Sequence, residues 1–77
     1  MNDAIADVTI HIDESIDPEA RVSLESRLLA LDGVTAASSH NGTSHLLVVK
    51  FDPERLQSHD ILLAVIATGL HAELIGL

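Results

Sequence analysis

The sequence predicts an α+β fold in which a four-stranded antiparallel sheet carries two helices on one face. Three observations support this prediction. Residues 8–13 alternate apolar and polar side chains with the period of two that is typical of half-buried strands, and residues 45–51 place Leu47, Val49 and Phe51 on one face of a second such segment. Segments beginning near Asp17 and Ser58 instead repeat apolar residues every three or four positions, as amphipathic helices do. Aspartate, glycine and proline separate these segments, which gives the order strand, helix, strand, strand, helix, strand.

The first strand and the first helix carry clear signals. Residues 8–12 place valine and isoleucine on one side of an extended segment and threonine and histidine on the other. Asp17-Pro18-Glu19 is typical of a helix start, because aspartate caps the first turn and proline fits its first position. Asp32-Gly33 ends the helix, since glycine readily adopts the left-handed conformation of a helix terminus. The apolar stripe of this helix comprises Ala20, Leu24, Leu28 and Leu31.

A hairpin is expected after the first helix. Residues 34–39 are predicted to form the second strand, and the Asn41-Gly42 pair that follows is favoured in tight hairpin turns. A third strand should therefore return beside the second over residues 45–51. Asp52-Pro53 ends this strand, because proline cannot donate the hydrogen bond that a central strand requires.

The second helix and a short final strand complete the pattern. Ser58 can cap a helix that runs to Gly69, and residues 71–77 form the last strand. Right-handed crossovers turn this order into one antiparallel sheet in the spatial order 4-1-3-2, with both helices on the same face. This is the ferredoxin-like βαββαβ arrangement. We expect it to form a single domain over residues 7–77, after a flexible lead over residues 1–6.

Composition and charge narrow the functional classes. The chain has 77 residues, no cysteine and a net charge of −8, so no disulfide supports its small core. An acidic chain disfavours nucleic acids and anionic membranes, which both need a basic surface. No apolar run approaches the roughly 18 residues of a membrane span. The first residues lack the basic and apolar regions of a signal peptide, so a cytoplasmic location is expected.

No catalytic function is expected. The chain has no cysteine nucleophile, no serine elbow motif and no glycine-rich phosphate loop. The loop after the first strand contains Asp13, Glu14 and Asp17, which would repel an anionic substrate such as an acyl phosphate. Binding of another molecule is therefore the expected activity.

Three segments carry a resemblance to a known family. They are Leu28-Leu29-Ala30-Leu31-Asp32-Gly33-Val34, Val49-Lys50-Phe51-Asp52-Pro53 and Ala67-Thr68-Gly69-Leu70-His71-Ala72-Glu73-Leu74. In order and spacing they resemble heavy-metal-associated domains, the copper-chaperone type, over nearly the whole chain. The third segment has Leu70 where that family usually has an aromatic residue. The resemblance implies the same ferredoxin-like fold.

The same resemblance implies a metal site that this chain lacks. The family binds Cu(I) or Zn(II) through a Cys-x-x-Cys pair, whose positions fall here on about Asp17 and Ala20. A carboxylate and a methyl group cannot replace two soft thiolates as ligands of Cu(I). Transfer of metal between cysteine pairs is therefore excluded for this chain. The resemblance assigns it no cofactor, and a divalent transition metal is the one candidate.

A histidine-rich end of the sheet gives one functional hypothesis. The predicted topology brings His11, His40, His45 and His71 to the same end of the domain. His11 and His71 should share the open sheet face, with His45 nearby and with carboxylates from Asp13 or Asp17. Imidazole and carboxylate ligands suit Zn(II), Ni(II), Co(II) or Cu(II). Ordinary surface histidines, or a pH-sensitive acidic and histidine patch, are the alternatives.

Apolar residues outside the expected core give the other hypothesis. On the helices these residues are Val22, Leu29, Leu63 and Ile66. On the open face of the sheet they are Leu46, Val48 and Ile75. Apolar surfaces of this kind indicate contact with a protein partner or a second copy of the chain, although scattered exposed aliphatics are also common. We therefore expect a non-catalytic binding module that acts through protein contacts or self-association.

Overall fold

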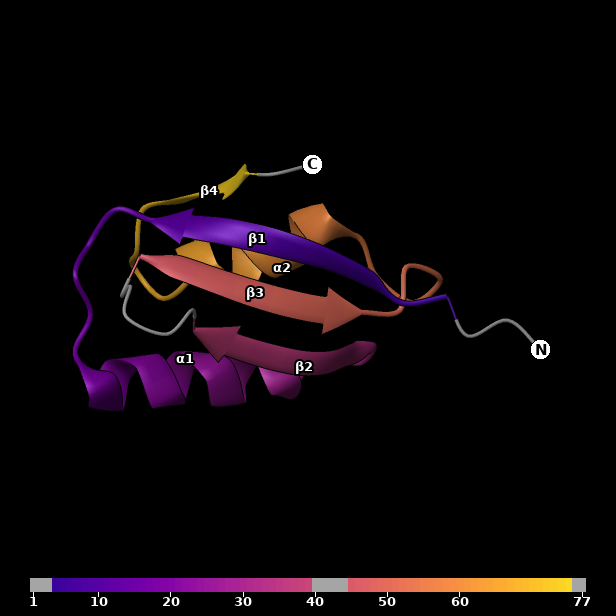
Figure 1. Cartoon of the computed structure of the whole chain (residues 1–77), viewed down its shortest axis with the longest axis horizontal. Coiled ribbons are helices and arrows are strands. Elements are labelled where there is room, and N and C mark those ends of the chain that lie inside the picture. Colours follow the sequence, from indigo (N-terminus) through magenta and orange to yellow (C-terminus); the bar gives the residue numbers. More distant parts are fainter. Residues whose placement is uncertain (1–3, 40–44, 76–77) are drawn as a thin grey trace.

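The architecture is the predicted βαββαβ sandwich. The structure, a computed structural model, describes residues 4–39 and 45–75, so the Asn41-Gly42 turn and His40 lie outside the described residues. The elements are β1 (Ala6–Ile12), α1 (Pro18–Leu29), β2 (Val34–Ser39), β3 (Leu46–Phe51), α2 (Ser58–Ile66) and β4 (Ala72–Ile75) (Figure 1). All strand pairs are antiparallel and the sheet order is β2-β3-β1-β4, which confirms the predicted fold.

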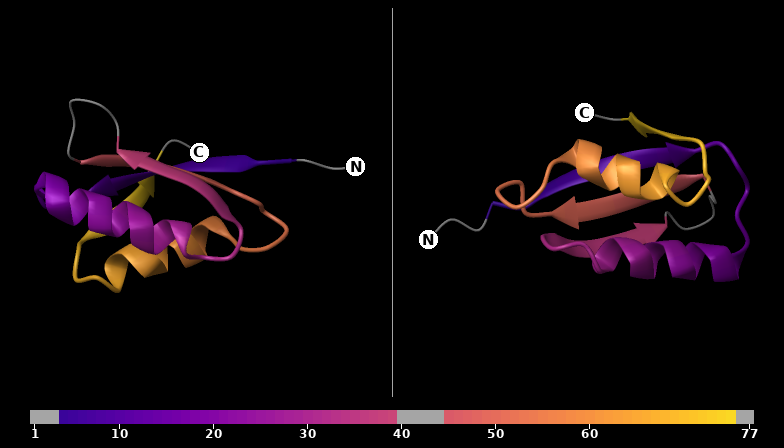
Figure 2. Two further views of the ribbon diagram at one scale, coloured as in Figure 1. Left: turned by 90° about the horizontal axis from the view of Figure 1, so that it is seen from below. Right: turned by 180° about the vertical axis from the view of Figure 1, so that it is seen from behind.

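The core lies between one face of the sheet and the two helices. Figure 2 shows α1 and α2 side by side on the same face of the sheet, while the other face is left open. Ten aliphatic or aromatic side chains, each at most 5% exposed, fill the space between the layers. They are Val8, Ile10, Ile12, Leu24, Leu28, Leu47, Val49, Phe51, Ile61 and Val65. Ala20, which the helical stripe placed inside, is exposed in the first turn of α1.

The start of α1 follows the predicted capping pattern, whereas the boundaries of α2 differ. Asp17 is the N-cap of α1, and its Oδ1 accepts a hydrogen bond of 2.8 Å from the Ala20 N–H. The N-cap of α2 is Gln57 rather than Ser58, because the Asp60 carboxylate accepts the Gln57 N–H at 2.8 Å. The α-helix ends at Ile66, three residues before the predicted end, since the next turn tightens toward a glycine with φ +99°.

Gly33 is required where the chain enters β2. Its φ of +106° is rarely adopted by residues with a side chain. A Cβ atom at this position would lie 2.6 Å from Leu56 Cδ2 and 2.8 Å from Arg55 Cβ. The Gly33 carbonyl also accepts the Asp52 N–H at 2.7 Å. The loop after β3 therefore packs directly on this glycine, which explains the Asp-Gly pair at the end of the first helical segment.

One side chain of α1 reaches the outer strand of the sheet. Glu25 Oε2 accepts hydrogen bonds of 3.0 Å from both the backbone N–H and the hydroxyl of Ser39. Ser39 is the last residue of β2, an edge strand without charged residues. The helix therefore satisfies a backbone donor that would otherwise remain open at this end of the edge.

Candidate functional site

Three histidines lie where β1 ends. The His45 carbonyl accepts the Ile12 N–H at 2.8 Å, and the His71 carbonyl accepts the Asp13 N–H at 2.8 Å. These two bonds hold the start of β3 and the start of β4 on opposite sides of the end of β1. His11 belongs to β1 itself, so the sheet topology alone brings the three residues to one edge.

His11 and His45 form a stacked pair. Their ring centroids are 5.9 Å apart with an interplanar angle of 18°. His45 Nδ1 lies 2.7 Å from the Ile12 carbonyl oxygen, which can only accept, so Nδ1 carries the hydrogen. The other ring nitrogen, Nε2, lies 3.4 Å from the Ser15 hydroxyl. His11 Nδ1 is 3.4 Å from Asp13 Oδ1, so one carboxylate accompanies the pair.

His71 belongs to a separate pair with Glu14. Glu14 Oε1 accepts the His71 backbone N–H at 2.9 Å, and Oε2 accepts the ring Nδ1 hydrogen at 2.6 Å. The bond to the Glu14 carboxylate raises the pKa of His71 above its ordinary value, because it favours the protonated ring. The same bond lowers the pKa of Glu14, and the backbone bond lowers it further. This pair ties the loop after β1 to the start of β4.

The predicted metal ligands do not converge. In the register of the sheet, His11 lies opposite Glu73, two residues beyond His71, and His71 is bonded to Glu14. His11 and His71 are therefore diagonal rather than direct neighbours across the two strands, and a metal ion shared between them stays a prediction. The Asp17 carboxylate caps α1 by accepting the Ala20 N–H, so this oxygen is already engaged in a hydrogen bond. Within residues 4–39 and 45–75, no three His, Asp or Glu side chains are placed to share a metal ion.

The predicted contact residues lie on two surfaces. The four aliphatic residues of the helices are largely exposed: Val22 60%, Leu29 48%, Leu63 48% and Ile66 41%. On the sheet, Val48 and Ile75 lie opposite Thr9 from the two neighbouring strands. Leu46 lies opposite His11, next to this row, and all three aliphatic residues are half-buried. The open sheet face therefore carries aliphatic residues on β3 and β4 on either side of Thr9 in β1.

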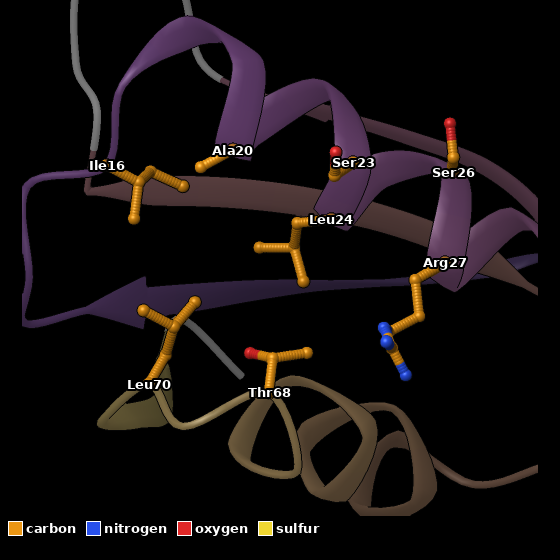
Figure 3. Close-up of a pocket in the computed structure, with 8 residues that line it drawn as sticks. All are labelled: Ile16, Ala20, Ser23, Leu24, Ser26, Arg27, Thr68 and Leu70. Carbon is orange, nitrogen blue, oxygen red and sulfur yellow. The ribbon is translucent and has the colours of Figure 1, made fainter.

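A groove between the helices is a feature that sequence reasoning missed. It has a volume of about 610 Å³ and lies between α1 and the segment that follows α2. Figure 3 shows Ile16 and Leu70 at one end, Leu24 and Thr68 in the middle, and Arg27 at the other end. The remaining lining residues are Ala20, Ser23 and Ser26. Its walls come from distant parts of the chain, so no local pattern predicts it.

Comparison with known proteins identifies the fold. No family model and no curated protein matches the chain. Several solved structures do match. A copper binding domain from HMA7, a P-type ATPase, has a TM-score of 0.81 and 23% identity, over 91% of this chain and 93% of that one. Oxidized MerP from Ralstonia metallidurans CH34 has a TM-score of 0.82 and 15% identity, over 95% and 100%.

A third structure is similar to the same extent. The N-terminal domain of a potential copper-translocating P-type ATPase from Bacillus subtilis, in its Cu(I)-loaded state, has a TM-score of 0.83 and 20% identity, over 95% of this chain and 90% of that one.

The donor set here does not fit Cu(I), because the chain contains no cysteine. No helix of the described residues is long and apolar enough to cross a membrane. At these identities the likeness shows the fold: the chain has the ferredoxin-like fold of heavy-metal-associated domains, and it contains no cysteine.

Proposed function

We propose that this chain is a non-catalytic binding module that acts through protein contacts, on a scaffold of the metal-chaperone type. The exposed aliphatic residues of its helices carry the proposal. Val22, Leu29, Leu63 and Ile66 are 41–60% exposed, although ten other side chains already complete the core. Only Ile5 joins them as an exposed large aliphatic among the described residues. Four of the five exposed large aliphatic residues therefore lie on the helices of a small acidic domain.

Burial of these side chains favours association. Transfer of apolar surface out of water contributes roughly 25 cal/mol per Å². Complete burial of one leucine at an interface is therefore worth about 1.5–3 kcal/mol, before the cost of association is subtracted. The open sheet face offers a second apolar surface through Leu46, Val48 and Ile75. The chain has one aromatic residue, so a contact must use aliphatic side chains rather than tyrosine or tryptophan anchors.

Light scattering coupled to size exclusion tests the self-association form of this proposal. We expect the wild-type chain to associate at high concentration, and Leu29→Glu or Leu63→Glu to return it to a monomer. His59→Glu is the matched control, because it adds the same charge at an exposed position of α2. A wild-type chain that stays monomeric, and is unaffected by the leucine substitutions, would leave a heterologous partner as the remaining form.

The histidine edge, which consists of His11, His45 and His71 at the end of β1, supports a second candidate function: binding of a divalent transition metal. The His11 and His45 rings are stacked and Asp13 lies beside His11, so these three side chains would have to reorient to share an ion, because no three described ligands are already placed to do so. Zn(II), Ni(II), Co(II) and Cu(II) accept such ligands. Calorimetric titration with each ion should then give affinities better than millimolar, lost in His11→Ala and His45→Ala and kept in His59→Ala. Millimolar or weaker binding of all four ions would end this candidate.

A further inference from the structure

The groove between the helices is apolar at one end and cationic at the other. Ile16 and Leu70 face each other at the apolar end, and the Leu24 side chain points into the space between the helices (Figure 3). Ser26 and Arg27 stand at the opposite end, with the Arg27 guanidinium extending from α1 toward α2 (Figure 3). An occupant of this groove should therefore have an apolar body and a polar or charged terminus.

Arg27 has its charge available for a ligand. The chain contains only four lysine and arginine residues, against 12 aspartate and glutamate residues. Arg55 is paired with Asp32 and Asp52. Arg27, in contrast, makes no ion pair or hydrogen bond through its side chain with another residue of the described ranges, and no carboxylate is among the described residues that line the groove. Arg21 and Lys50 also form no ion pair with another described residue, but Arg27 is the one basic residue among those that line the groove, so its guanidinium can pair with an anion bound there.

The charge of the chain favours an anion with a single negative charge over one with two. One guanidinium balances one carboxylate, whereas a phosphate dianion would also meet the repulsion of a chain with net charge −8. Thr68 cannot add a donor, because its hydroxyl already donates to the Val65 carbonyl at 2.6 Å. Ser23 and Ser26 line the same wall as Arg27, but the Ser26 hydroxyl points away from the space between the helices (Figure 3), so the Arg27 guanidinium is the principal donor.

The size of the groove fits a small molecule. Its volume of about 610 Å³ lies within the range of about 300–1,000 Å³ that is typical of ligand pockets. We infer that the groove binds a small apolar monocarboxylate, with its hydrocarbon part between Ile16, Leu24 and Leu70 and its carboxylate at Arg27. This activity goes beyond protein contact, and it uses neither the exposed leucines nor the histidine edge.

Titration with butanoate, hexanoate and octanoate, followed by amide NMR shifts, tests this inference. We expect shifts at Leu24, Thr68 and Leu70. Affinity should rise by roughly twofold to fourfold per added methylene and level off when the groove is full. The matched alkylamides should bind more weakly, since they carry no charge for Arg27. Equal binding of acids and amides, or shifts confined to other surfaces, would overturn the proposal.

Two substitutions separate the charged end from the apolar end. Arg27→Gln should weaken binding of octanoate by about threefold to tenfold and leave octanamide unaffected. Arg21→Gln removes the same charge from the same helix outside the groove and is the matched control. Ala20→Leu should fill the groove and weaken the acid and the amide alike. An equal effect of Arg21→Gln and Arg27→Gln would contradict a local contact at Arg27.

A further arm distinguishes a free acid from the end of a polypeptide. A short apolar peptide ending in leucine is titrated with its terminus either free or amidated. We expect it to bind more weakly than octanoate, because its backbone amides must lose water in an apolar groove. Binding of the free-terminus peptide without binding of any alkanoate would overturn the small-molecule proposal and assign the groove to a chain terminus.

Discussion

Single side chains in the loop before α1 show how position decides the role of a carboxylate. Asp17 stands about where the resembled family has its first cysteine, and here it accepts the Ala20 N–H as the cap of α1. Glu14, three residues earlier, instead accepts two hydrogen bonds from His71 across the end of the sheet. The first role follows from the Asp-Pro-Glu pattern. The second depends on where β4 begins and could not be read from the loop itself.

Removal of the α1 cap should weaken the domain. We expect Asp17→Ala to lower the free energy of unfolding by about 1 kcal/mol, because a helix N–H loses its acceptor. Asp17→Ser should retain most of the stability, since serine can also cap. Urea unfolding followed by circular dichroism measures both. Equal losses in the two variants would show that the carboxylate acts through something other than capping.

The Glu14–His71 pair should make stability depend on pH. The raised pKa of His71 stabilises the fold below about pH 6.5, and this contribution is lost as the pH rises through the folded pKa. The lowered pKa of Glu14 stabilises it above about pH 4.5, and this contribution is lost as the pH falls through its folded pKa. The pair therefore contributes most between these two values.

Glu14→Gln tests this dependence. The loss of melting temperature should be largest between about pH 4.5 and 6.5 and smaller at pH 8. An NMR titration should show that the pKa of His71 falls toward its ordinary value in the variant. A melting-temperature difference that is the same at every pH would indicate that the carboxylate matters only for packing.

At the scale of elements, local pattern predicts the fold and tertiary contact decides its details. The period-two pattern of residues 8–12, the apolar face of residues 45–51, and the Asp-Pro and Asp-Gly boundaries predict the six elements and the sheet order that the structure shows. The end of α2 was placed three residues too late, because a helix and the tighter turn that closes it share the same apolar spacing. Propensity cannot separate these two conformations near a terminus.

The candidate sites were less predictable than the elements. The histidine edge follows from topology, but the partners His11–His45 and His71–Glu14 depend on strand register and on one loop conformation. The groove depends on how far α1 stands from the segment after α2. No residue spacing encodes that separation, because it results from packing of the whole core.

The two glycines at element ends should tolerate substitution differently. Both have positive φ, but only Gly33 is enclosed, by Leu56 and Arg55, whereas no atom lies within 4 Å of a Cβ added at Gly69. We expect Gly33→Ala to cost about 2–4 kcal/mol, from backbone strain and steric overlap together. Gly69→Ala should cost about 1–2 kcal/mol, from strain alone. Chemical denaturation of the two variants compares them, and equal losses would contradict the close packing at Gly33.

At the scale of the whole molecule, charge opposes the contacts that the apolar surfaces favour. Each copy has a net charge of −8, so two copies repel at low ionic strength. In the proposed function, the open sheet face and the exposed aliphatic residues of the helices would provide the attraction. Association of identical copies should therefore be controlled by salt, whereas a basic partner would be attracted at low salt.

Raising the salt concentration should increase self-association. The screening length falls from about 30 Å at 0.01 M to about 8 Å at 0.15 M, which removes most of the repulsion between copies. We expect the weight-average mass from light scattering to rise over this range in the wild type and to stay constant in Leu63→Glu. A mass that falls with added salt would show that ionic pairs, rather than aliphatic side chains, hold the copies together.

The bond between Glu25 and Ser39 bears on how far such assembly can proceed. A strand that adds to β2 must first displace a carboxylate that already accepts two hydrogen bonds at 3.0 Å. Joining copies edge to edge in an open-ended fibre requires both outer strands of every copy. Because Glu25 occupies the Ser39 end of β2, copies that paired through β4 would be favoured to stop at a dimer over extending into a filament.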